Sequence, residues 1–583
     1  MVAPHIFWRR LARLTVLVAA PALLLTACSV LLPAAPAAPT TATSLPNGVA
    51  AGDVTQTSAV LWARSTVTGP MTFVTSSSDE MPAQTATTTA LDPSLPVTVT
   101  VENLTPGTEY TYRVTTAGGE SAGGVFRTPH AADGHYGLRF GASGDWRGSL
   151  LPFVAARNVP ARELDFFVAM GDSVYADRPS PAVPLVQAAT LDEFRRKHAE
   201  VYSEAAEMNT LADLRASTAL FATIDDHEVT NDFAGGAPAA ADGRFVEESG
   251  LINQTALYTN GLATFFAFNP LRAERYGVMG GDGRMDGAPK LYRYRLFGLD
   301  AALFILDARS FRDLPLARPD RNDPADVARF RAETFRPERT MLGHAQMADL
   351  QRDLLDAQAR GVTWKFIGIP EPIQHRGLMS AQDRFEGYAA ERAALLRFID
   401  EEGISNVVFV SADIHGTQVN NITYSLGPDA PQIALPVFEV TTGPLAYSST
   451  LGPIIIADGR DKGYVSEEEA ATYAALPVAN DRDNVPDDRD DFAKGIVDRE
   501  LVATGYDPLG LDGAPVDAHL LEGDYVALHT YGWTEFDINA ATQVLTVTTY
   551  GVAPYVESDL ESAPADVWAR QPQVVSRFRV TPQ

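Results

Sequence analysis

The sequence predicts an α/β fold preceded by a small all-β domain. Between residues 46 and 130, short β-branched or aromatic runs alternate with turn residues, which is typical of an antiparallel sandwich. From residue 136 to 583, apolar strands end in clusters of polar side chains, as in "LDFFVAMGDSVY". Between several of these strands lie stretches with helical spacing of apolar residues, such as 344–361.

The chain begins with features of an exported protein. A basic section with Arg9 and Arg10 precedes an apolar run that is too short for a convincing membrane span. We therefore expect a signal peptide over residues 1–28. Its end, "LTAC", resembles the lipobox of bacterial lipoproteins, which implies lipidation of Cys28. An ordinary signal peptide with an incidental cysteine is the alternative, and the arginine pair leaves the twin-arginine route open.

Residues 29–45 are rich in Pro, Ala and Thr and carry no charge, which predicts a tether behind the anchor. The expected product is a monomeric lipoprotein that faces the periplasm or the cell exterior, with Cys28 holding it to the membrane. The net charge of −28 argues against duplex nucleic acid as a partner, because phosphate contacts need clustered Lys and Arg. Within the all-β domain, "LTPGTEYTYRV" (104–114) resembles the signature of fibronectin type III-like modules.

Four predicted strands end in side chains of the types that bind metal ions in proteins. Ligands collect beyond the carboxyl ends of strands in open α/β sheets, so we expect these clusters to converge. One such cluster is typical of a capped turn, but four favour a site for one or two hard or borderline cations. Two metals about 4 Å apart suit phosphoryl chemistry. The clusters are Asp145; Asp172 and Tyr175; Asp225, Asp226, His227, Glu228, Asn231 and Asp232; and Asp413 and His415.

The order of these motifs (GD, GDxxY, D-H-E, and a late DxH) resembles the calcineurin-like metallophosphoesterases, and more narrowly the PhoD-like (alkaline phosphatase D) family. Segments 47–64, 292–313, 339–354 and 438–446 also resemble that family. The resemblance implies an α/β sandwich of two mixed β-sheets flanked by helices. It also implies a metal-dependent phosphoesterase that acts on small phosphoesters.

The resemblance further implies roles for individual residues. His227 is expected to contact the leaving group or a phosphate oxygen. Asp172 is expected to bridge two metal ions. The remaining ligands implied are Asp145, Tyr175 and His415 for the first metal, and Asp226, Asn231 and Asp413 for the second.

Metal type follows from the donor atoms. Asp413 stands where the wider superfamily has histidine, so the second site is rich in oxygen and suits Ca²⁺ or Mn²⁺ better than Zn²⁺. Tyr175 favours Fe³⁺ or another transition metal at the first site. Some family members use an early cysteine ligand with Fe³⁺ and Ca²⁺; in this chain Asp145 takes that position.

Three further features leave alternatives open. Arg309 either grips substrate phosphate or forms a salt bridge with Asp307. His375 is either a metal ligand or lines a pocket or the surface. The acidic run 480–492 is either a solvated loop or a peripheral Ca²⁺ site, since it lacks the glycine and the final Glu of an EF-hand.

The expected function is extracytoplasmic hydrolysis of phosphate monoesters, diesters or both, by attack of a metal-bound hydroxide. One alternative is a dedicated phosphodiesterase that acts on teichoic-acid-like polymers or phospholipid headgroups. A second is a non-catalytic surface lipoprotein that binds cations or glycans through its β domain.

Overall fold

The computed structural model describes residues 44–77, 83–278, 283–379 and 381–583. The expected signal peptide, Cys28 and most of the expected tether lie outside these residues. Among the described helices, none is both long and apolar enough to cross a bilayer.

One large mixed sheet carries the first three predicted site clusters. Its strands β8, β9 and β10 run parallel, whereas β22, β23 and β24 are antiparallel to their neighbours. The order is β20 (Ala518–Gly523), β24 (Gln573–Val580), β23 (Leu545–Val552), β22 (Tyr531–Ile538), β8 (Leu138–Trp146), β9 (Phe166–Met170), β10 (Ala219–Thr223), β1 (Val49–Thr55), β2 (Ser58–Ala63) and β5 (Val97–Glu102), and β19 (Pro444–Ala446) pairs with β8.

A second mixed sheet carries the fourth cluster. Strands β14, β15, β16 and β18 run parallel, and β13 and β17 are antiparallel. The order is β13 (Arg293–Phe297), β14 (Ala301–Ile305), β15 (Trp364–Gly368), β16 (Val407–Ser411), β18 (Ile433–Thr441), β17 (Thr417–Tyr424) and β21 (Val526–Ala527).

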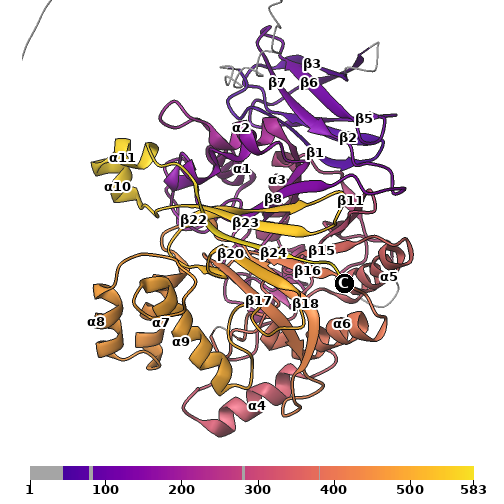
Figure 1. Cartoon of the computed structure of the whole chain (residues 1–583). Helices are drawn as coiled ribbons and strands as arrows, with labels where there is room; N and C mark the ends of the chain where they lie inside the picture. Colours follow the sequence, from indigo (N-terminus) through magenta and orange to yellow (C-terminus); the bar gives the residue numbers. More distant parts are fainter. Residues whose placement is uncertain (1–43, 78–82, 279–282, 380) are drawn as a thin grey trace, which may run out of the picture. The chain divides into compact units, whose positions relative to one another are not determined.

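The main core lies between the two sheets. Phe140 of β8 stacks on Phe166 at 4.6 Å and meets Phe366 of the second sheet edge-on at 4.8 Å between ring centroids. Helices cover the outer faces of the two sheets (Figure 1). Their apolar side chains form a core with each of these faces. The first sheet is covered by α1 (Leu191–Val201), α2 (Thr210–Ser217) and α3 (Ala256–Phe268), and the second by α5 (His344–Ala359) and α6 (Ala389–Glu401). The predicted sandwich of two mixed sheets flanked by helices is confirmed.

The amino-terminal strands are shared between two sheets. Strand β1 pairs in parallel with β10, through Ala51 opposite Ala219 and Gly52 opposite Leu220, so β1, β2 and β5 extend the large sheet. The other strands of this region form a separate sheet in the order β4 (Gln84–Ala90), β3 (Gly69–Ser76), β6 (Glu109–Thr115) and β7 (Ser121–Arg127). The fibronectin type III-like assignment stays a prediction.

A buried ion cluster ties β1 to the edge of the second sheet. Asp53 lies 3.0 Å from Nε of Arg293 and 2.5 Å from Nη2 of Arg295, both on β13. The backbone N–H of Arg272 also donates to Asp53, at 3.0 Å. Burial alone would favour the protonated carboxyl, but the charges of Arg295 and Arg293 keep the pKa of Asp53 below its usual value.

Helices α7, α8 and α9 share a smaller core with β21. They lie together at the lower left of Figure 1, beside β17. The bounds of these three helices are α7 (Leu451–Lys462), α8 (Glu467–Ala475) and α9 (Arg489–Ala503). The remaining helices and strands are α4 (Pro324–Thr334), α10 (Glu557–Ser562), α11 (Pro564–Trp568), β11 (Glu274–Arg275) and β12 (Pro289–Lys290).

Candidate metal centre

The predicted clusters follow the carboxyl ends of parallel strands in both sheets. Five of their residues have left-handed backbone, with φ of 61° at Asp145, 52° at Asp172, 51° at Asp232, 68° at Asp413 and 61° at His415. Residues other than glycine adopt this conformation uncommonly, and such strained positions concentrate at functional sites. The end of β8 and the segments after β9, β10 and β16 therefore hold these side chains in place at a cost in backbone energy.

Asp145 lies at the centre of the first group. Its Oδ1 atom is 3.3 Å from Nε2 of His415 and 3.4 Å from the hydroxyl of Tyr175. Its other oxygen, Oδ2, is buried and has no hydrogen-bond partner among the described residues. The ring of Tyr447 packs against His415 and Tyr175, with centroids 3.8 and 5.1 Å away.

Asp172, Asp226 and His227 form the second group. One ligand atom of each lies within 4.8 Å of the others. Nε2 of His227 is 3.9 Å from an oxygen of either carboxylate, and Oδ1 of Asp226 is buried without a hydrogen-bond partner among the described residues. Burial and the charges of nearby carboxylates, Asp226 above all, raise the pKa of Asp172 well above its usual range.

Asp177 orients His227. Its Oδ1 atom lies 2.6 Å from Nδ1 of the ring, and its Oδ2 atom accepts the backbone N–H of Asn231 at 2.9 Å. Burial disfavours a charged ring, yet Asp226 and Asp177 raise the pKa of His227 to about 9. Asp177 is not among the residues predicted from sequence, although it follows Tyr175 by two positions in "GDSVYAD".

Glu228 joins two strand ends rather than facing the metal groups. Its Oε1 atom accepts the backbone N–H and the hydroxyl of Ser173, both at 2.7 Å. Its Oε2 atom accepts the N–H groups of Asp225 at 3.0 Å and Asp172 at 3.2 Å. This buried carboxylate thus fixes the turn after β9 against the turn after β10.

Asp413 and Asn231 have other contacts in the structure. Oδ2 of Asp413 lies 2.5 Å from Nη1 of Arg384. Burial opposes the charge on Asp413, but Arg384 and Arg309 hold its pKa below the usual value. Asn231 is anchored through its backbone, where its carbonyl accepts from Arg244. Asp413 is not part of the Asp172–Asp226–His227 group.

Arg309 is fully buried behind these groups. Its guanidinium lies 2.7 Å from Asp225, 2.5 Å from Glu371 and 3.2 Å from Asp383. The salt bridge between Arg309 and Asp307 that the sequence left open is not formed. Arg309 pairs with the three carboxylates above, and Oδ1 of Asp307 accepts its backbone N–H. The loop that supplies Glu371 and Asp383 carries no motif that would identify them from sequence.

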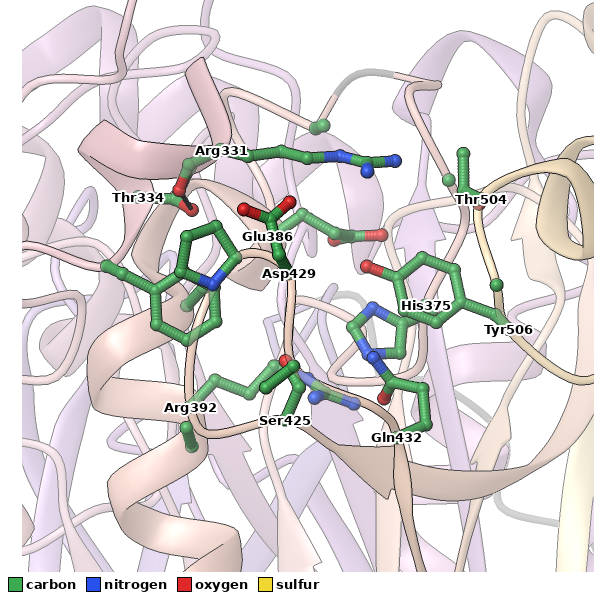
Figure 2. Close-up of a pocket in the computed structure, with 18 of the residues that line it drawn as sticks. Arg331, Thr334, His375, Glu386, Arg392, Ser425, Asp429, Gln432, Thr504 and Tyr506 are labelled. Carbon is green, nitrogen blue, oxygen red and sulfur yellow. Dashed lines mark hydrogen bonds between the residues drawn. The ribbon is translucent and has the colours of Figure 1, made fainter. Parts of the chain in front are cut away.

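His375 lies in a different place. It lines a cavity of about 430 Å³ together with Glu386 and Arg392, and its ring stacks on Tyr506 with centroids 3.7 Å apart (Figure 2). Burial and the charge of Arg392 lower the pKa of His375 well below its usual value. Of the two alternatives, the structure shows His375 as a residue that lines a pocket.

The two groups have the properties of a cation site. Buried carboxylate oxygens without partners are costly, and buried charges in proteins are paired or coordinate metals. The donors comprise carboxylates, imidazoles and a phenol, which together suit hard and borderline cations. The fold and the site define the chain as a two-sheet α/β protein with a candidate cation site at its strand ends.

The family model described as PhoD-like phosphatase matches residues 142–480, and the model of the family's N-terminal domain matches residues 32–130. The chain therefore belongs to the PhoD-like phosphatase family. Alkaline phosphatase D of Bacillus subtilis (strain 168) is 26% identical over 293 residues. That match spans 46% of this chain and 44% of the relative, less than half of its length.

A solved structure described as "Structure of PhoD" has the same fold. It superposes with a TM-score of 0.63 and 18% sequence identity, covering 93% of this chain and 91% of that one. The similarity therefore extends through the amino-terminal strands and both sheets.

Proposed function

We propose that this protein is an extracytoplasmic, metal-dependent phosphoesterase that hydrolyses phosphate monoesters, diesters or both. The observation that carries the proposal is the buried Asp172–Asp226–His227 group beside Asp145, Tyr175 and His415. Family membership supports it.

The residues fall into two proposed ligand sets. Asp145, Tyr175 and His415 would hold Fe³⁺ or another transition metal, and Asp172 would be shared. Asp226 would hold Ca²⁺ or Mn²⁺, together with Asn231 and Asp413 as further proposed ligands. When bound, the cations would activate a water molecule and neutralise charge on the phosphate oxygens.

His227 is proposed to act on the leaving group. Asp177 holds Nδ1, so that Nε2 is directed to the side of Asp172 and Asp226. Asp226 and Asp177 raise the pKa of His227 and so favour a protonated ring, which can donate its proton to a departing oxygen. Arg309 pairs with Asp225, Glu371 and Asp383 and also lies 3.8 Å from Asp226, and we propose that it acts through Asp225 rather than on substrate.

The test compares metal-depleted protein with protein resupplied with single cations. The substrates are p-nitrophenyl phosphate and bis-p-nitrophenyl phosphate, which separate monoester from diester hydrolysis. Depletion should abolish turnover, and Ca²⁺ or Mn²⁺ with Fe³⁺ should restore it more fully than Zn²⁺. Full turnover after complete depletion would overturn the proposal.

Export and anchoring rest on the sequence alone. We propose that Cys28 carries a lipid that holds the mature chain outside the cytoplasm. Cys28→Ala should move the protein from the membrane fraction to the soluble exported fraction. A wild-type protein that is already soluble, with its amino terminus beyond residue 28, would contradict this.

A further inference from the structure

A second cluster of carboxylates, away from the candidate metal centre, lies in and beside the acidic loop before α9. One oxygen each of Asp481, Asp483 and Asp491 lies within 4.8 Å of the others. Asp481 and Asp483 are exposed on the loop, whereas Asp491 lies in the first turn of α9 and is 95% buried, with 5% of its surface exposed. The loop therefore closes over a buried carboxylate, and this group shares no residue with the metal centre described above.

Three carboxylates around this point each have an unused oxygen. The Oδ2 atoms of Asp488, Asp491 and Asp524 are buried and have no hydrogen-bond partner among the described residues. Asp488 and Asp524 are each 2% exposed. A buried polar atom without a partner costs about 1–3 kcal/mol, and more for a charged group. Three buried carboxylate oxygens without partners at one place therefore indicate a binding position for a cation.

Helix capping does not use these oxygens. Asp488 caps α9 through Oδ1, which accepts the backbone N–H of Asp491 at 2.9 Å, and its Oδ2 stays free. The neighbouring Asp490 is accounted for, because Oδ1 accepts the N–H of Leu528 at 3.1 Å and contacts His529.

The nearest lysine is engaged elsewhere. Nζ of Lys494 donates to Asn484 at 2.5 Å and to Asp498 at 3.4 Å. The charge of Lys494 offsets only part of the repulsion between Asp491 and the neighbouring carboxylates. Burial, Asp488 and Asp524 still raise the pKa of Asp491 to about 7. Burial raises the pKa of Asp524 to about 6.

We propose that Asp481, Asp483 and Asp491 bind a structural Ca²⁺ ion, with Asp488 and Asp524 adding negative charge around it. The donors are all oxygen, which favours a hard cation. Ca²⁺ accepts six to eight oxygens in flexible geometry and can complete its shell with loop carbonyls and water, whereas Mg²⁺ demands near-ideal octahedral geometry. The ion links the exposed loop to the first turn of α9. This role is separate from phosphoester hydrolysis.

The test uses the full exported chain and two readouts of the same site. Equilibrium dialysis with ⁴⁵Ca²⁺ should count one Ca²⁺ fewer per chain in Asp483→Asn and Asp491→Asn than in wild type. Trypsin cleavage after the exposed Arg482 should slow about tenfold when Ca²⁺ is added to wild type, and should not respond in the two variants. Mg²⁺ at the same concentration should not protect.

Asp487→Asn is the matched control, because Asp487 is exposed in the same loop and lies outside the group. It should keep both the calcium count and the protection. Asp483 is exposed, so Asp483→Asn keeps the test valid even where Asp491→Asn does not fold. An unchanged calcium count in Asp483→Asn, or protection by Mg²⁺ equal to that by Ca²⁺, overturns the proposal. Turnover of Asp483→Asn should equal that of wild type, which separates this test from that of the proposed function.

Discussion

Nδ1 of His227 lies 2.6 Å from Oδ1 of Asp177, and the other oxygen of the same carboxylate accepts the backbone N–H of Asn231. One buried aspartate thus fixes both the imidazole ring and the loop that follows it. Ligating and catalytic histidines depend on such outer partners for their tautomer and orientation.

Asp177→Asn should lower turnover about 10- to 100-fold. Asp177 helps to raise the pKa of His227 to about 9, so its loss should let the ring lose its proton at lower pH. The alkaline limb of the kcat/KM profile should therefore move toward neutral pH. Asp192→Asn, at an exposed position on α1, is the control. An unshifted alkaline limb would show that Asp177 does not tune His227.

Asp172→Asn should reduce the content of both metals and lower turnover by at least about 10³-fold, roughly 4 kcal/mol in barrier. The reason is that Asp172 is the proposed shared ligand. Asp225→Asn is a matched buried control: its carboxylate pairs with Arg309, so stability should fall more than metal content. Full metal content with near-normal turnover in Asp172→Asn would exclude the bridging role.

Arg309→Met should destabilise the protein by about 3–5 kcal/mol, because Asp225, Glu371 and Asp383 would lose a buried counter-charge. Urea unfolding measures the change. If Arg309 instead held substrate phosphate, the variant would unfold like wild type and show a raised KM.

Asp53→Asn should destabilise the protein by about 3–5 kcal/mol at neutral pH, since it leaves a buried arginine cluster unmatched. The pKa of Asp53 is lowered in the fold, so its contribution is complete above the unfolded pKa of about 3.9 and is lost as pH falls through the folded value. The difference in unfolding free energy between wild type and variant should stay constant from pH 7 to about 5 and shrink below about 4. A constant difference down to pH 3 would contradict this account.

Much of the candidate metal centre could be located from sequence because its residues lie at or just after the ends of predicted strands. Asp145, Asp172 and Tyr175 each come within a few positions of a buried apolar run, and strand ends in parallel sheets meet at one edge. Arg384 and Asp383 could not be predicted in this way. They lie in a loop without periodicity, and their contacts with Asp413 and Arg309 depend on how that loop packs.

The limits of the sequence are clearest for the strands of residues 46–130. Alternating apolar residues predict strands there, but the same alternation fits a separate sandwich and an extension of a neighbouring sheet. The pairing of Ala51 with Ala219 decides between these arrangements, and it depends on contacts far apart in the sequence.

That pairing has a consequence for the order in which the chain is made. Strand β1 is synthesised long before β10, and Asp53 must wait for Arg293, which is 240 positions further on. Until then a nascent chain carries an open strand edge and a carboxylate whose counter-charges do not yet exist, and open edges invite pairing with other chains. Any fragment that stops before β10 would keep both liabilities. The strand pairing and the charge balance of the amino-terminal strands are thus completed by residues from the middle of the chain.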